Sequence, residues 1–439
     1  MRLVLVIVVV LAVLTDGLSG RALTLKRALN LAQEHSLKMK GASSQVEAAR
    51  LACRSAGRDR WPSISVNANS FYNSEVPSLD IELPPPASVS LSRELGTSET
   101  YHLDLRLSLP LSTGGRISNN IEQTWANLDY YRAFDQLETD RSVFQARLAY
   151  LSLARADRMH TAAGASLRRA EIINDNVRSL HAAGAADSID LLEAHLALTE
   201  AASRVETAGR KYRLAEIDLL TILGLPLSES LELAAIPEAS HQNVNTTKLL
   251  PVSFGKPELA MADASIAASR SRIKFARAEY FPNITAYAGY SVGKPGLDRF
   301  NNNWNDYFTI GTNLVWSFNI GNKTGITAGM LESRYRAAQY QRDQITEDIN
   351  REAQLTLEKL KLTDQQYITA RKRYEISSDK YRLATQKHRR GALSVNRLLE
   401  IEAALTKTQA ILVAAQIDHQ IALSAHYFAV GSDKLKEGF

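Results

Sequence analysis

Four segments of the chain alternate apolar and polar side chains over about ten residues each. In residues 102–109 (HLDLRLSL) every second position is leucine, and the same period of two occurs in 64–69, 285–292 and 308–319. Such a period is typical of β-strands that present one apolar face. We therefore predict four strands, two in each half of the chain.

Long segments without proline separate these strands and predict helices. Because proline interrupts a helix interior, its absence from 111–225 and from 296–439 marks helical regions. Small residues and tyrosines recur every three or four positions in 353–384, which indicates a coiled-coil-like seam. At 1.5 Å per residue, helices over 119–181 and 326–388 would each be about 95 Å long.

A shorter helix is expected to return along each long one. These returning helices fall at about 188–223 and 395–430. Because they are shorter than their partners, we expect the segments 24–60 and 257–280 to continue their line.

The chain consists of two copies of one unit. Residues 109–116 (LPLSTGGR) align with 316–323 (WSFNIGNK) at a shift of 207, and the same shift brings the segment around Gly184 onto that around Gly391. The first strands of the two copies align at a shift of 220, so copy one has thirteen extra residues, which fall in the loop 76–89. Such self-similarity is the mark of an internal repeat.

The repeat divides the chain into four parts. They are a signal peptide over 1–22, a first repeat over 23–232, a linker over 233–256 and a second repeat over 257–439. In the first repeat we expect a β-hairpin at about 61–111 and a tip turn, the connection between the long and the returning helix, at about 182–187. In the second repeat the hairpin falls at about 281–320 and the tip turn at about 389–394, followed by a short tail.

The N-terminus and the composition limit the class of protein. Arg2, the apolar run 3–14 and the small residues after it form a secretory signal peptide, and the run is too short for a membrane anchor. The formal net charge of +5 is spread among interleaved acids and bases, so no nucleic-acid partner is expected. The single cysteine, Cys53, forms no intrachain disulfide, and no metal, cofactor or catalytic motif is present.

The alternating sheet has no cover within the chain. A half-buried sheet on a soluble core is the ordinary interpretation, but the helices use their apolar stripes on one another. Strands that are apolar on one side and polar on the other fit a transmembrane barrel with a wet interior. Aromatic residues near the strand ends suit the girdle of such a barrel: Trp61, Phe281, Tyr307 and Trp316.

Four strands are too few to close a barrel. In hydrocarbon an open strand edge leaves unpaired N–H and C=O groups that cost several kcal/mol each, so the edges must pair with other chains. Eight strands leave little lumen, whereas three chains supply twelve strands and a usable pore. The fold class we predict is a membrane α+β protein, a homotrimer in outer-membrane lipid in which four strands per chain complete a 12-stranded barrel. A long α-helical, coiled-coil-like periplasmic part continues the barrel.

At this point the sequence resembles the TolC family of bacterial outer-membrane efflux proteins. The matching motifs are the strand-to-helix junction 108–116 (SLPLSTGGR), the entries RWP and YFP to the first strand of each copy, and the turns at Gly184 and Gly391. The resemblance covers the whole mature chain. It implies a trimeric, non-enzymatic duct whose twelve-helix tunnel docks on a periplasmic adaptor (membrane fusion protein) and an inner-membrane transporter.

The junction and the tip turns contain the candidate structural sites. At the junction we single out Pro110, Gly114, Gly115 and Gly321. The pair Gly114–Gly115 reads as a strand-to-helix hinge, since a nucleotide loop would need a following Lys-Ser/Thr.

Each tip turn has the signals of a helix end followed by a helix start. Gly184 and Gly391 suit the left-handed position just past a helix end. Asp187 and Ser394 suit the N-caps of the returning helices, and Asp190 in the first turn favours the helix dipole.

The resemblance adds a gate to this structural account. In the family, acids six and nine residues after the turn glycine line the closed periplasmic entrance and favour cations. The matching residues are Asp190, Glu193, Arg397 and Glu400, of which Arg397 departs from the acidic pattern. An arginine at a helix start is unfavourable, so we expect it to have a partner, for example Asp190 of the facing hairpin.

The resemblance also makes the tips the adaptor-docking surface. The residues concerned are Gly184, Ala185, Ala186, Arg390, Gly391, Ala392 and Leu393, with Arg389 as added charge. His181 and His388 each lie three residues before a turn glycine. Two roles fit these histidines, a pH-sensitive latch and ordinary packing.

Three functions fit the sequence. The first is the exit duct of a tripartite efflux system, the second is the exit duct of a type I protein secretion system, and the third is a periplasmic coiled-coil protein with a small sheet. The four alternating strands argue against the third. The substrate is not readable, because in a passive duct the pump selects it.

Overall fold

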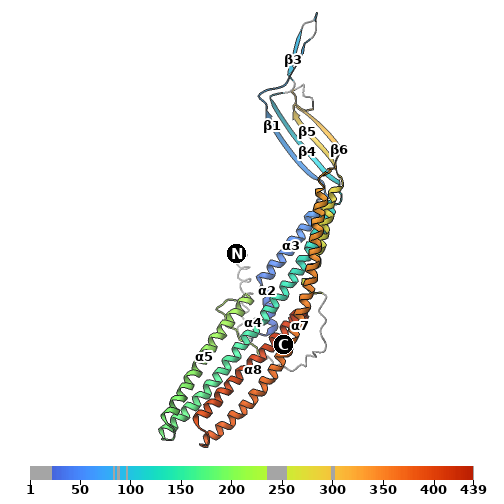
Figure 1. Ribbon diagram of the computed structural model, residues 1–439. Coiled ribbons are helices and arrows are strands. Elements are labelled where there is room, and N and C mark those ends of the chain that lie inside the picture. The colour runs from blue at the N-terminus through green and yellow to red at the C-terminus, as the bar shows by residue number, and fades with distance from the viewer. Residues whose placement is uncertain are drawn as a thin grey trace, which may run out of the picture. The chain divides into compact units, whose positions relative to one another are not determined.

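A computed structural model describes residues 22–82, 85–86, 89–94, 97–234, 255–297 and 302–438 (Figure 1). The predicted signal peptide, apart from residue 22, and the linker residues 235–254 lie outside the described residues. The contacts divide the chain into two compact units, and each unit takes segments from both repeats. Unit one comprises 1–44, 133–259 and 343–439, and unit two comprises 45–132 and 260–342.

Unit two contains the predicted four-stranded sheet. Its strands are β1 (Ser63–Tyr72), β4 (Glu99–Ser112), β5 (Asn283–Lys294) and β6 (Asn305–Val315), and their order in the sheet is β1-β4-β5-β6 (Figure 1). All neighbours are antiparallel. Because β4 pairs with β5, one continuous sheet joins the two repeats, while β1 and β6 each pair with only one strand of the described chain. The four predicted strands are confirmed.

The register places the apolar alternating positions of the four strands on one face, although β6 ends at Val315 and the predicted alternation over 308–319 continues past it. One row across the sheet consists of Val66, Leu105, Tyr290 and Phe308. These side chains are exposed, and Phe308 retains 64% of its accessible surface. A sheet that leaves such a face uncovered has a surface for another apolar phase.

The opposite face of the sheet is polar. Ser291 donates a hydrogen bond to Asp104 across β4 and β5, with 2.6 Å between the oxygens. The Arg106 guanidinium lies 5.0 Å from the centre of the Tyr287 ring, a cation–π contact. The two faces therefore have the chemistry that the alternation predicts.

A second, two-stranded sheet was not predicted. The extra segment of repeat one contains β2 (Ser78–Glu82), which pairs antiparallel with β3 (Ser90–Glu94) directly after it. Segment 76–89 is thus not wholly a loop, and the predicted hairpin over 61–111 contains a smaller hairpin between its strands. Five-residue strands offer too few alternations to stand out from the surrounding sequence.

The long helices confirm the repeat. Helix α4 (Arg116–Ala182) and helix α7 (Lys323–Arg389) each have 67 residues, and their bounds differ by 207 at both ends. The returning helices α5 (Ser188–Leu223) and α8 (Val395–Val430) have 36 residues each and the same shift. Each ends at a glycine in the left-handed conformation, Gly224 in the first repeat.

Two N-terminal helices replace the single predicted segment 24–60. Helix α2 (Leu25–His35) ends at Ser36, and helix α3 (Leu37–Arg58) follows directly. The Ser36 hydroxyl accepts from the backbone N–H of Met39 at 3.3 Å, so a local side-chain contact ends one helix and starts the next. The corresponding helix of repeat two, α6 (Pro257–Arg277), is uninterrupted.

The main core of unit one lies where α2, α4 and α5 meet the C-terminal tail. It is built of buried aliphatic residues around Tyr150, whose hydroxyl donates to the Leu23 carbonyl at 3.1 Å. Burial raises the pKa of Tyr150 to about 12.

Arg147 fastens the C-terminal tail to α4. Its guanidinium donates to Ser424 Oγ at 2.9 Å and to the carbonyls of Leu435 and Glu437 at 3.0 and 2.9 Å. Burial lowers the pKa of Arg147, which is the dominant effect on this group.

Candidate functional site

The two tip turns of unit one have the same backbone. Gly184 and Gly391 both have φ of +72°. In each turn the glycine N–H donates to the carbonyl three residues before it, at 3.0 Å for Gly184 and 2.9 Å for Gly391. The N–H of the residue after the glycine donates to the carbonyl five residues before itself, at 2.8 Å in the first turn and 3.0 Å in the second. This is the Schellman pattern that ends helices. The left-handed conformations predicted at both glycines are confirmed.

Both predicted N-caps are present as well. Asp187 accepts from the N–H of Asp190 at 2.8 Å, and Ser394 accepts from the N–H of Arg397 at 3.4 Å. The returning helices therefore begin with one of their free N–H groups satisfied.

The two tip histidines close the turns. His181 Nδ1 lies 3.0 Å from the Ala186 carbonyl, and His388 Nδ1 lies 2.9 Å from the Leu393 carbonyl. A carbonyl only accepts, so Nδ1 of each ring holds the proton in this contact. The sequence allows two roles for these histidines, ordinary packing and a pH-sensitive latch. The structure gives each ring a defined contact with the backbone.

The four residues predicted for the gate lie in the first two turns of the returning helices. Arg397 forms an ion pair with Glu400 of its own helix at 2.5 Å, and both side chains are exposed. The partner within one chain is therefore Glu400 and not Asp190, because residues three apart lie on the same helix face. Asp190 and Glu193 are half-buried, and neither forms an ion pair with any residue that the structure describes.

The residues predicted for docking lie at the surface of the tips. Ala185, Arg390 and Ala392 are exposed, and Ala186 and Leu393 are half-buried against the core that joins the two helical hairpins. That core is formed by Ile173, Val177, Ala194, Ala384, Val395, Leu398 and Ile401.

An apolar stripe next to this surface was not predicted. Ile189, Leu192 and Leu196 recur at three- and four-residue spacing on α5 and are all exposed, Leu192 to 68%. The spacing places them on one helix face. Period-3.6 analysis of 188–223 could have found the stripe, but not that it stays uncovered within one chain.

A buried polar network also joins the two hairpins. Glu402 Oε1 on α8 accepts from Ser166 Oγ at 3.0 Å and Arg169 Nε at 3.1 Å, both on α4, and from Thr406 Oγ1 at 2.7 Å. The exposed fractions of the Arg169 and Glu402 side chains are 17% and 8%. The network therefore couples the hairpins of one chain about two helical turns from the start of α8 and about four turns from the end of α4.

At the strand-to-helix junction of unit two the repeats differ. Gly114 and Gly115 have φ of +61° and +91°, and a Cβ on Gly114 would lie 2.5 Å from Phe281 Cβ. In repeat two Asn322, at φ of +50°, is left-handed, whereas Gly321, the counterpart of Gly114, is not. Asparagine tolerates this conformation, so repeat two turns with one left-handed residue where repeat one uses two.

Pro110 lies at an irregularity of the junction. The register between β4 and β5 shifts between Pro110 and Ser112. Proline has no N–H to donate, so it fits where the strand pairing is interrupted.

Two further properties concern the described residues alone. None of their helices is both long and apolar enough to cross a membrane. Among them, no three His, Cys, Asp or Glu side chains gather as metal ligands would.

Residues 28–225 and 255–432 match the sequence profile of the outer membrane efflux protein family. The chain belongs to this family. The two matched stretches coincide with the two repeats.

Two relatives are named for an export or efflux system. The chain is 28% identical over 190 residues to the pyoverdine export outer membrane protein OpmQ of Pseudomonas aeruginosa, covering 43% of this chain and 39% of OpmQ. It is 26% identical over 219 residues to the toluene efflux pump outer membrane protein TtgF of Pseudomonas putida, covering 48% of this chain and 44% of TtgF. The aligned stretches thus span less than half the length of these relatives.

Solved structures show the fold. The MtrE outer membrane channel of Neisseria gonorrhoeae superposes with a TM-score of 0.77 at 16% identity, covering 93% of this chain and 89% of MtrE. The CmeC outer membrane channel of Campylobacter jejuni superposes with a TM-score of 0.76 at 14% identity, covering 93% and 85%.

The family places this efflux protein in the outer membrane, with its helical part in the periplasm. The family consists of trimeric, non-enzymatic transport channels. Membership in an outer-membrane family also accounts for the uncovered apolar face of the sheet, since lipid is the phase that covers it.

Proposed function

We propose that three copies of this chain form the outer-membrane exit duct of a tripartite efflux system. The observation that supports this most is the four-stranded sheet with one apolar, uncovered face, one polar face, and single-sided pairing of β1 and β6. In lipid the free edges must pair, and pairing β6 of one copy with β1 of the next closes a ring without edges.

The polar face of the sheet then lines the pore. Asp104, Arg106, Tyr287 and Ser291 are all on this face and bond to one another in pairs. They offer both charge signs and no deep pocket, which suits passive conduction and leaves selection to the inner-membrane transporter. The relatives named for pyoverdine export and toluene efflux support small molecules as cargo and an efflux pump as driver.

The tips dock on the periplasmic adaptor in this proposal. Both are rigid backbone turns, fixed by left-handed glycines, caps and histidine contacts, and they present small residues outward. The exposed stripe around Leu192 supplies apolar area beside them for a neighbouring chain.

The gate is formed by acids of three copies around one axis. Of the three acids at these positions, Asp190 and Glu193 form no ion pair with a described residue, whereas Glu400 is paired with Arg397. A ring of carboxylates favours cations. Asp190→Ala with Glu193→Ala should therefore lower cation preference in planar bilayers, and unchanged ion selectivity would exclude these side chains from the constriction.

Mass measurement of the purified protein in detergent tests the assembly. We expect a trimer with an intact barrel, and a stable monomer or dimer with all four strands protected from exchange would contradict the proposal. In a host that lacks its own exit duct, the chain together with its adaptor and pump should restore growth on small toxic molecules. Restored secretion of a polypeptide without such resistance would instead indicate the type I secretion duct.

A further inference from the structure

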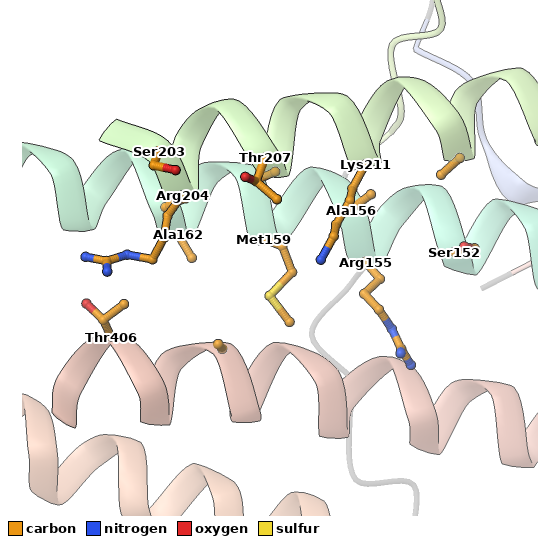
Figure 2. A pocket seen from close by; sticks show the side chains of 14 residues that line it. Ser152, Arg155, Ala156, Met159, Ala162, Ser203, Arg204, Thr207, Lys211 and Thr406 are labelled. Carbon is orange, nitrogen blue, oxygen red and sulfur yellow. The ribbon is translucent and has the colours of Figure 1, made fainter. Parts of the chain in front are cut away.

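A cavity of about 550 Å³ lies in unit one between the α4–α5 hairpin and α8 (Figure 2). Ligand cavities of proteins are commonly about 300–1,000 Å³. Its lining residues come from α4, α5 and α8. On α4 the lining runs from Ser152 to Ala163, which corresponds to roughly 16 Å along the helix axis.

The walls are apolar in the middle and cationic at the edges. Figure 2 shows Met159 pointing into the space between the helices, with Arg204 and Arg155 toward opposite ends and Lys211 beside it. Alanines such as Ala208 make up most of the remaining wall. No acidic side chain lines the cavity.

The positive charge is only partly balanced. Arg155 is paired with Asp418, but its Nε is buried without a hydrogen-bond partner. Arg204 is 3.6 Å from Glu200, and both are substantially exposed. Within the part of the chain that the structure describes, Lys211 forms no ion pair. Lys211, and the N–H groups of Arg204 that do not face Glu200, are therefore available to an acceptor in the cavity.

The repeat indicates that these cations are not required by the fold. The positions 207 residues further on, which have the same place on α7 and α8, are Leu362, Ile411 and Asp418. The same helix packing is thus made with two aliphatic residues and an acid. The basic set in repeat one is a property of this cavity alone.

We propose that this cavity binds a small amphipathic organic anion, a carboxylate or sulfonate head on a single alkyl or flat aromatic body. The apolar body lies along Met159 and the alanines, the head accepts from Lys211, and Arg204 adds positive charge at the other end of the cavity. A lone inorganic anion would leave the apolar wall wet, and a neutral lipid would leave the cations unused. The site is separate from the tip turns, since its lining on α4 ends at Ala163 and the turn begins after Ala182.

Calorimetry with dodecanoate tests the proposal on the purified protein in phosphatidylcholine nanodiscs, with empty discs as the reference. We expect one site per chain. Lys211→Gln should raise the dissociation constant about fivefold, because a partly exposed ion pair contributes up to about that factor, and Arg204→Gln together with Lys211→Gln should raise it further. Dodecanol, which lacks the charge, should bind more weakly and be insensitive to these changes.

Arg210→Gln is the matched control, because Arg210 is adjacent in sequence, highly exposed and paired with Glu206 outside the cavity. Ala208→Trp should abolish binding by filling the space, and Met159→Trp serves the same purpose if that variant does not fold. Equal affinity of Lys211→Gln, Arg210→Gln and parent would overturn the site, as would binding to the filled variant. Saturable dodecanol binding of equal strength would show an apolar groove without anion recognition and also refute the proposal.

Discussion

Removing the charge of Glu402 should loosen the two hairpins of one chain near the tip. Glu402→Gln keeps the size of the side chain and one carbonyl oxygen, but leaves the Arg169 guanidinium, only 17% exposed, without its carboxylate. The change isolates the ion pair from packing, since the residue volume stays nearly constant.

The expected magnitude follows from the geometry. At 3.1 Å and an effective dielectric constant of about 20, the attraction between the two charges is about 5 kcal/mol before desolvation is subtracted. Breaking a buried pair by removing one partner typically costs about 3–5 kcal/mol. Since Arg169 keeps some access to water, we expect a loss of about 2–4 kcal/mol.

Hydrogen exchange of the assembled protein is the assay, because a membrane trimer rarely unfolds reversibly as a whole. Amides of α4 near Ser166 and of α8 near Glu402 should exchange about 30-fold faster or more, while the core around Tyr150 should not change. Asp379→Asn is the control, because the Asp379–Arg382 pair on α7 is exposed and such pairs contribute about 0–1 kcal/mol. If Glu402→Gln is no faster than this control, the network does not hold the hairpins together.

Three further outcomes are expected. Gly184→Val with Gly391→Val should strain both tips by about 1 kcal/mol or more each and abolish transport with the barrel intact. Gly164→Val, at an ordinary helical position with open space, should transport normally. Transport by the double variant would contradict the tip assignment. Because the pKa of Tyr150 is raised, its contribution to the free energy of unfolding is complete below about pH 10 and falls by up to about 2–3 kcal/mol as pH rises toward 12. Tyr150→Phe should therefore flatten the pH dependence of stability measured by denaturant over that range. An unchanged pH dependence in this variant would refute the expectation. Burial lowers the pKa of His426, so its contribution is present above about pH 6.5 and is lost as pH falls; His426→Gln should reduce the acid sensitivity of exchange in α8, and equal sensitivity would contradict it.

The strands, the long helices and the repeat could be predicted because each is written locally in the sequence. The alternation in 102–109 predicts the two faces of β4, and the absence of proline predicts the helices α4 and α7. The shift of 207 even relates the helix bounds of the two copies. A repeated segment can be recognised from the sequence without knowing which residues it contacts.

The contacts between distant residues could not be predicted in the same way. Nothing in the sequence says which of the many arginines meets Glu402, since Arg169 and Glu402 are 233 positions apart. The cavity beside Met159 is likewise defined by three helices together. The break at Ser36 depends on one hydroxyl contact, and serine occurs inside helices elsewhere in the chain.

Arg397 shows how far a local argument reaches and where it ends. The dipole argument predicts that an arginine in a first helical turn needs an acid, and the structure provides one in Glu400. The sequence predicted a partner on the facing hairpin. A partner three residues away on the same helix is favoured instead, because it costs less ordering than one on another element. Because Arg397 and Glu400 neutralise each other, the carboxylates that remain without an ion pair at the proposed gate positions are those of Asp190 and Glu193 of repeat one. The proposed selectivity therefore depends on one hairpin per chain, although the two tips share the same backbone.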